Sequence, residues 1–274
     1  MRRNATRTDC EHRAIGAFPW RRTRYCVFLM AAVFGMADVI AATADDLSTR
    51  ERRQMVDEIA ATARSTASDT GREAFSDRVM AAMGRVERHR FVPAAVASQA
   101  YRDSPLPIGS GQTISQPYIV ALSTDLIEPK PDHTVLEIGT GSGYQAAVLA
   151  ELVRNVYSIE IVEALGRDAA QRLASIGYHN VEVRIGDGYK GWPEKGPFDG
   201  IIVTAAAPFV PAPLIAQLKP GGKMVIPVDA GILHQNLMLV EKQADGTTKN
   251  RVVLRVRFVP LTGPGVREGV PGRK

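Results

Sequence analysis

The stretch of sequence that decides the fold is Val135-Leu136-Glu137-Ile138-Gly139-Thr140-Gly141-Ser142-Gly143-Tyr144. Its apolar start, interrupted only by Glu137, is typical of a buried strand. Gly139, Gly141 and Gly143 then let the backbone approach a ligand closely, and Tyr144 opens a helix whose N–H groups lie beside that ligand. The spacing is neither the G-x-G-x-x-G of dinucleotide binders nor a P-loop. It predicts a ligand site at the carboxyl edge of a sheet; a tight strand–helix connection is the alternative.

From Thr134 onward, short apolar strands alternate with helices, which predicts a parallel sheet between two layers of helices. We therefore expect an α/β fold with a doubly wound, mostly parallel sheet. The strands are expected near Thr134–Ile138, Val156–Glu160, Val181–Ile185, Gly200–Thr204 and Met224–Val228, and the helices near Tyr144–Arg154, Val162–Ile176 and Pro211–Leu218. Two later strands, Asn236–Glu241 and Arg251–Val259, flank an Asp245-Gly246 turn and predict a C-terminal β-hairpin.

The residues before the sheet predict an N-terminal helical cap and a loop. Ser48-Thr49-Arg50-Glu51 has the form of a capping box, so Ser48 is expected to be the N-cap of a first helix. A second helix is expected from about Ser76 to Arg88, and a third from Pro117 to about Ile127. The segment Tyr101–Ser115, rich in proline and glycine, is expected to be a loop.

The first 44 residues have the order of a secretory signal peptide. An arginine-rich start precedes an apolar run from Tyr25 to Ala37, and Ala42-Thr43-Ala44 follows. A disordered extension is the alternative. We expect four parts: the leader (1–44), N-terminal helices with the substrate loop (45–133), a sheet domain that binds the cofactor (134–262) and a flexible tail (263–274).

The basic pI of about 9.3 comes from the leader. Its first 24 residues hold seven arginines and two acids, and 7 − 2 = +5 is the formal net charge of the whole chain. Binding to nucleic acid needs several cationic side chains on the fold itself, so nucleic acid is not an expected partner. Both cysteines lie near the N-terminus and the five histidines are scattered, so neither a disulfide framework nor a metal site is expected.

Two more acidic residues follow predicted strands. Glu160 ends the second strand, about twenty residues past the first glycine, where a carboxylate can accept both hydroxyls of a ribose. Asp187, in Gly186-Asp187-Gly188, follows the third strand and can accept from an adenine amino group. Each alone could be a turn or cap residue. Together with Glu137, however, they put three carboxylates at neighbouring strand ends.

This pattern resembles the class I S-adenosylmethionine-dependent methyltransferases, and the resemblance implies S-adenosyl-L-methionine as cofactor. The glycines would shape the pocket for its methionine end, Glu160 would hold the ribose and Asp187 would face the adenine. The residues implied to bind it are Glu137, Gly139, Gly141, Gly143, Glu160, Asp187 and Gly188. Members that methylate bases usually carry an Asn/Asp/Ser-Pro-Pro-aromatic motif, which Thr204–Pro208 lacks, so a base is not the expected acceptor.

Several segments resemble the protein-L-isoaspartate O-methyltransferases. They lie in family order between about Ser48 and Thr262: Arg90-Phe91-Val92-Pro93, Tyr101–Gly109, Gly111–Pro117, Thr204–Pro208 and Val256–Leu261. The resemblance implies methyl transfer to the α-carboxyl of L-isoaspartyl residues in damaged proteins and peptides. The ester would then form a succinimide, whose hydrolysis returns some aspartyl linkage. The substrate would be bound by Thr113, Ile114, Ser115 and Gln116, with Ser115 as the active-site serine.

Ser115 also stands where an N-cap is expected, just before Pro117, so a purely structural role is the alternative. The chemistry needs no strong general base, because a carboxylate is already ionised at neutral pH. The barrier falls mainly by holding oxygen, methyl carbon and sulfur in line. Two other functions stay open: methyl transfer to a different carboxyl or small-molecule acceptor, and cofactor binding without catalysis.

The expected state is a metal-free monomer without stable membrane association. The cellular compartment of the protein has two interpretations. S-adenosylmethionine is made in the cytosol, which favours the cytoplasm, whereas the leader favours export with cleavage after Ala44.

Overall fold

The computed structural model describes residues 47–231 and 234–269. The predicted leader, residues 1–44, lies outside these ranges. The chain divides into two units, Met1–Leu47 and Ser48–Lys274, and apart from residue 47 the second contains all the elements discussed below.

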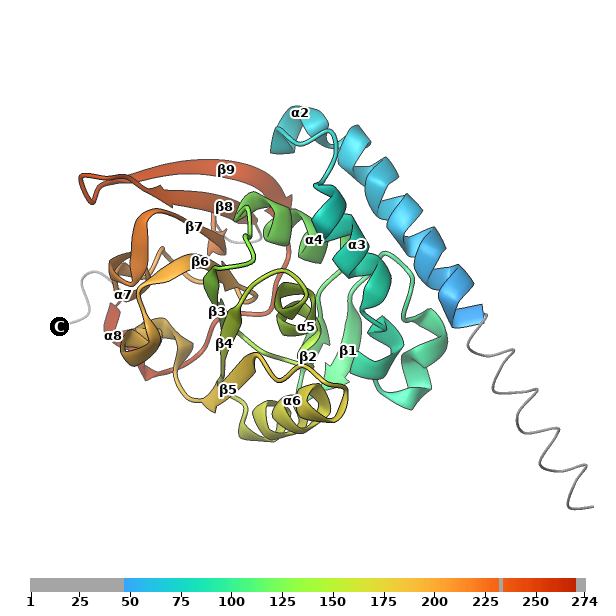
Figure 1. Cartoon of the computed structure of the whole chain (residues 1–274). Helices are drawn as coiled ribbons and strands as arrows, with labels where there is room; N and C mark the ends of the chain where they lie inside the picture. Colours follow the sequence, from blue (N-terminus) through green and yellow to red (C-terminus); the bar gives the residue numbers. More distant parts are fainter. Residues whose placement is uncertain (1–46, 232–233, 270–274) are drawn as a thin grey trace, which may run out of the picture. The chain divides into compact units, whose positions relative to one another are not determined.

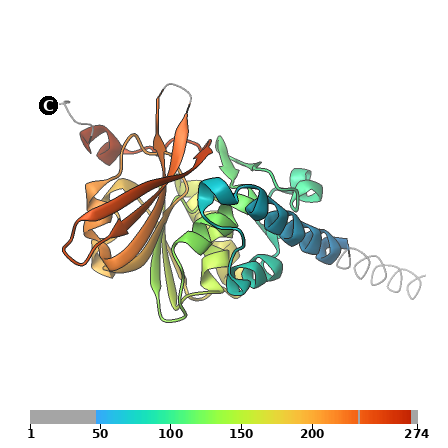
Figure 2. The ribbon, with the colours of Figure 1, turned by 90° about the horizontal axis from the view of Figure 1, so that it is seen from above.

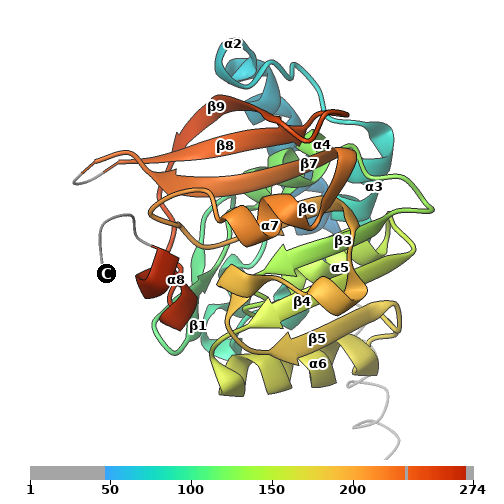
Figure 3. The ribbon, with the colours of Figure 1, turned by 90° about the vertical axis from the view of Figure 1, so that its left-hand side faces the viewer.

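A seven-stranded sheet with the order β5-β4-β3-β6-β7-β8-β9 forms the centre of this unit (Figure 3). Its strands are β3 (Thr134–Ile138), β4 (Asn155–Glu160), β5 (Val181–Ile185), β6 (Phe198–Val203), β7 (Leu218–Asp229), β8 (Gln235–Lys242) and β9 (Thr248–Val256). Strands β3 to β7 pair in parallel, and β8 and β9 continue the sheet antiparallel. The predicted fold class and the C-terminal hairpin are therefore confirmed.

Helices cover both faces of the sheet, as the alternating pattern predicts. These helices are α4 (Pro117–Leu126), α5 (Tyr144–Ala150), α6 (Glu163–Ser175) and α7 (Ala212–Ala216). Neighbouring residues of β3 enter two different apolar clusters: Val135 joins the cluster of α4 and α5, and Leu136 joins the cluster that contains Leu214 of α7. The near-continuous apolar run of β3 thus reflects burial on both faces.

The N-terminal helices lie on one side of the sheet and α8 lies on the other (Figures 1 and 2). The first described helix covers residues 47–65 and is followed by α2 (Ala67–Thr70) and α3 (Asp77–Arg85). The predicted N-cap Ser48 is wrong, because residue 47 is already helical and an N-cap has non-helical backbone. Ser76 does cap α3, accepting a hydrogen bond from the Val79 N–H at 3.4 Å.

Two regions expected to be irregular are ordered. The predicted loop Tyr101–Ser115 contains a small hairpin, β1 (Leu106–Gly109) with β2 (Gln112–Ile114). Its turn, Ser110-Gly111, has φ values of 51° and 70°, which suit a tight hairpin turn. The expected flexible tail begins with the helix α8 (Pro264–Gly269). Short 3₁₀ segments complete the chain: η1 (Arg88–Phe91), η2 (Ala94–Gln99), η3 (Gly188–Lys190) and η4 (Pro193–Lys195).

Candidate active site

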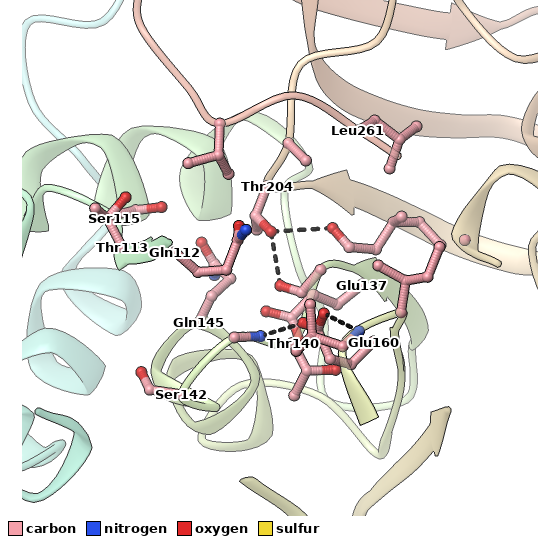
Figure 4. A pocket seen from close by; sticks show the side chains of 18 of the residues that line it. Gln112, Thr113, Ser115, Glu137, Thr140, Ser142, Gln145, Glu160, Thr204 and Leu261 are labelled. Carbon is pink, nitrogen blue, oxygen red and sulfur yellow. Dashed lines mark hydrogen bonds between the residues drawn. The ribbon is translucent and has the colours of Figure 1, made fainter. Parts of the chain in front are cut away.

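A cavity opens at the carboxyl ends of the central parallel strands. The strand order reverses here, because β4 and β6 lie on opposite sides of β3. Ligands of open α/β sheets bind at such a point. Figure 4 shows Thr113 and Ser115 together at one side of this first cavity, with Leu261, Glu137 and Glu160 on the opposite side.

The glycine turn lies directly against the end of β6. Gly139 has a φ of 94°, and a Cβ placed there would lie 2.3 Å from Thr204 Oγ1. The Thr204 hydroxyl donates to the carbonyl oxygens of Ile138 at 3.0 Å and of Gly139 at 2.6 Å. A side chain at Gly139 would therefore push apart two strand ends that form the cavity wall.

Glu160 joins the glycine turn to the end of β4. One carboxylate oxygen accepts from the Gly141 N–H at 2.7 Å and the other from the Val162 N–H at 2.9 Å. Only 5% of the residue is exposed, and it lines the first cavity. Each oxygen keeps a further lone pair, so a carboxylate fixed in this way can still accept hydroxyl donors from a ligand.

Glu137 is the fully buried acid of the cavity. Burial raises its pKa to about 8, although the Ser158 hydroxyl donates to one of its oxygens. Thr140, another lining residue, lies 2.5 Å from Ser158 through the two hydroxyl oxygens. The backbone N–H of Ala146 also lowers the pKa, and no described residue donates a hydrogen bond to Oε1. A buried acceptor without a donor is a place for a cationic or N–H group of a ligand.

Ser115 follows β2 and does not cap α4. The N-cap is Gln116, whose side chain makes no cap hydrogen bond. Asp103, from the preceding loop, provides the cap instead: one carboxylate oxygen accepts from the Tyr118 N–H at 2.8 Å and the other from Gln116 Nε2 at 2.8 Å. Asp103 thus takes over the structural role that was the alternative for Ser115, and among the described residues no hydrogen bond ties down the Ser115 hydroxyl.

A second cavity adjoins the first. It lies between the N-terminal helix, the start of α4 and the end of β9. The side chains shared by both cavities are Thr113, Ser115, Thr204 and Val259. The predicted substrate residues thus occupy the junction: Ile114 lines only the first cavity and Gln116 only the second.

The structure brings together most of the predicted cofactor residues. Glu137, Gly139, Gly141, Glu160 and Gly188 all line the first cavity, and a Cβ at Gly188 would lie 2.3 Å from Ile138. Gly143 instead faces α6, where a Cβ would lie 3.1 Å from Leu173. Asp187 is beside the cavity, its oxygens accepting from the N–H groups of Tyr189 at 3.0 Å and Gly265 at 2.7 Å.

Some functional residues escaped the sequence reasoning. Thr140 lies within the glycine motif and Gln145 lies two residues after it. Both could have been found as polar residues of this turn and of the helix that it opens. Leu261 and Thr262 reach the cavity because the Leu261 N–H donates to the Ala206 carbonyl at 2.7 Å, a pairing without a local sequence signal.

The comparisons with known proteins agree with this geometry. The family model for protein-L-isoaspartate(D-aspartate) O-methyltransferases matches residues 68–265, more than half of the chain. The chain belongs to this family. A Polaromonas protein-L-isoaspartate O-methyltransferase 2 is 62% identical over 76% of the chain and 99% of its own length. A Cupriavidus necator protein-L-isoaspartate O-methyltransferase 1 is 59% identical over 86% of the chain and 91% of its own length.

Solved structures of the same family share the fold. One protein-L-isoaspartate O-methyltransferase has a TM-score of 0.68 and 28% identity, covering 77% of this chain and 66% of that one. A Plasmodium falciparum structure described as a PCMT, in complex with S-adenosyl-L-homocysteine, has a TM-score of 0.60 and 27% identity, covering 68% and 91%. Membership in the family confirms the predictions of an S-adenosyl-L-methionine-dependent methyltransferase of protein repair.

The residues of the first cavity fit this cofactor. The unsatisfied oxygen of Glu137 and the Ser142 hydroxyl, which has no partner among the described residues, are buried polar atoms. Glu160 offers a fixed carboxylate for a diol, and Gly188 packs directly against the Ile138 side chain in the cavity wall. Among the described residues, no three His, Cys, Asp or Glu side chains gather as metal ligands. In the same ranges, no helix is long and apolar enough to cross a membrane.

Proposed function

We propose that this protein transfers the methyl group of S-adenosyl-L-methionine to the α-carboxyl of L-isoaspartyl residues in damaged proteins and peptides. The observation that carries the proposal is the junction of two cavities at Thr113 and Ser115. A donor in the first cavity and an acceptor peptide in the second would meet there. The cited relatives carry the name of this activity.

The residues around the junction suit a carboxylate nucleophile. A new C–O bond forms as the C–S bond of the sulfonium breaks, so that S-adenosyl-L-homocysteine leaves. The acceptor carboxylate is ionised at neutral pH and needs no general base. The Ser115 hydroxyl is free to donate to one carboxylate oxygen and to orient the other toward the methyl carbon. The following backbone nitrogen then attacks the ester carbonyl, so that methanol leaves and a succinimide forms, and hydrolysis of the succinimide returns some aspartyl linkage.

The cofactor would be held by three anchoring groups. Glu160 would accept hydrogen bonds from the ribose hydroxyls. The side of the first cavity that Glu137 and Ser142 form would receive the methionine end. At the adenine end, Gly188 would form the wall, with Asp187 fixing the turn through the Tyr189 N–H. A direct hydrogen bond from the adenine amino group to Asp187 would use a remaining lone pair of that carboxylate.

Labelled cofactor offered with an isoaspartyl peptide and its aspartyl twin tests the proposal. We expect base-labile label on the isoaspartyl peptide alone. Label on a different carboxyl compound and not on the peptide would favour the alternative acceptor. Cofactor binding without label on any acceptor would favour a non-catalytic role.

The oligomeric state and the cellular compartment of the protein are part of the same proposal. We propose a monomer, because both cavities are formed within one chain, and sedimentation or light scattering checks this. For the compartment we propose the cytoplasm, where the cofactor is made. Sequencing the N-terminus of the native protein tests the alternative, since a first residue at Asp45 would mean cleavage after Ala44 and export.

A further inference from the structure

The second cavity carries an unbalanced positive charge. Arg255 and Arg257 line it, together with His234, and no described aspartate or glutamate does. Both arginines are exposed, and neither guanidinium forms an ion pair or hydrogen bond with a described residue. Three other arginines near the surface form ion pairs, namely Arg72 with Glu128, Arg85 with Glu151 and Arg167 with Glu163.

The position of the two arginines suits an extended chain. Arg255 lies at the end of β9, the last strand of the sheet and a neighbour of α2, and Arg257 follows just after the strand ends (Figure 1). Side chains two residues apart along extended backbone point to the same side, about 7 Å from each other. An extended peptide presents its own alternate side chains at the same spacing. The cavity that the arginines line is continuous with Ser115.

We propose that Arg255 and Arg257 bind carboxylate side chains flanking the isoaspartyl residue, so that the enzyme prefers damage sites in acidic segments. This inference rests on the function proposed above. The planar fork of arginine matches a carboxylate, and the absence of any acid from the described lining means that an incoming carboxylate meets no repulsion. Because the arginines are exposed, the preference is modest and depends on ionic strength.

Six isoaspartyl peptides of equal length test the preference. In the first three peptides, the second and fourth positions after the isoaspartyl residue are both glutamate, both glutamine or both lysine. In the other three peptides, the second and fourth positions before the isoaspartyl residue are changed in the same way. With the full chain, we expect glutamate to lower KM about three- to tenfold relative to glutamine on one of the two sides, and lysine to raise it. The difference should shrink at about 0.5 M salt.

Variants separate this inference from other effects. The double variant Arg255→Gln/Arg257→Gln should equalise the KM values, and Arg255→Glu/Arg257→Glu should reverse the preference, which misfolding cannot imitate. Arg251→Gln, an exposed residue of the same strand outside the cavity, is the matched control and should keep the preference. Equal KM values for all six peptides with turnover intact would overturn the inference alone. No base-labile methyl ester on the glutamine peptides would overturn the proposed function itself.

Discussion

The Ser115 hydroxyl has no fixed partner among the described residues, unlike the nearby side chains of Asp103 and Thr204. Asp103 caps α4, and Thr204 is bound to two carbonyl groups of the glycine turn. A hydroxyl that lines both cavities and remains free can be used by a substrate. The sequence alone left two roles open for Ser115, because a cap contributed by a residue twelve positions upstream has no local signal.

We expect Ser115→Ala to lower kcat about tenfold or more, because a hydrogen bond to a charged oxygen is lost. The Kd of the cofactor should change much less, since the cofactor site does not depend on this hydroxyl. Steady-state kinetics and calorimetry measure the two quantities. Ser175→Ala, at the exposed end of α6, is the control. An unchanged kcat would leave Ser115 without a part in the chemistry.

Glu137 makes the folded state sensitive to pH. Its pKa rises from the ordinary 4.5 of an unfolded chain to about 8 in the fold. Between these values the folded state holds a proton that the unfolded state has lost, so the stability contributed by this group falls as pH rises from about 4.5 to 8. The cost is about 1.4 kcal/mol for each unit of difference.

The variant Glu137→Gln should therefore be more stable than the wild type at pH 8 and nearly equal to it at pH 5. The gain in Tm should be several degrees at pH 8, at roughly 2–4 °C per kcal/mol. Thermal unfolding of both proteins at the two pH values measures it. The same Tm difference at both pH values would mean that Glu137 does not titrate in this range.

At the level of elements, a single buried arginine holds the loop that carries the substrate residues. Arg88, at the start of η1, donates to the carbonyl oxygens of Ala100 at 2.8 Å and Ser104 at 3.2 Å. Its guanidinium also lies 4.8 Å from the ring centre of Tyr144 in α5. Burial lowers the pKa of Arg88, and the two carbonyls and the ring compensate for the lost water.

Replacing Arg88 by methionine should destabilise the fold by about 2–4 kcal/mol, because two buried carbonyl groups lose their donors. The KM for an isoaspartyl peptide should rise more than the Kd of the cofactor, since the loop leads to Asp103 and Ser115. Urea unfolding and kinetics measure these changes. Arg90→Met, which breaks only an exposed pair with Glu87, should cost less than about 1 kcal/mol. Similar small losses for both variants would contradict this role of Arg88.

Across the whole molecule, the parts that the sequence predicted are those with local signals. The strand–glycine–helix repeat defined the sheet and the carboxyl edge where Glu137 and Glu160 meet. The hairpin β1–β2 was missed because its strands hold only four and three residues. The helix α8 was missed because it depends on Asp187, which accepts from Gly265 across 78 positions. Contacts of this range have no periodicity along the chain.

The N-terminal helix offers a test of where the folding unit begins. The family model starts only at residue 68, yet Met55, Ile59 and Ala63 of the helix over 47–65 are fully buried in the core. Thr62 and Thr66 of the same region line the second cavity. The compact unit begins at Ser48. A chain that begins at Ser48 should therefore match the full chain in Tm, in cofactor Kd and in kcat/KM.

A chain that begins at residue 68 should lose both stability and peptide affinity. Removing the buried methionine and isoleucine leaves core surface exposed, at a cost of about 2–5 kcal/mol for each large side chain. The KM for an isoaspartyl peptide should rise as well, because one wall of the second cavity is gone, whereas the cofactor site retains all its lining residues. Denaturant unfolding and peptide kinetics on the two shortened chains measure the contrast. Equal stability of the two shortened chains would show that the helix over 47–65 packs against a core that is already complete without it.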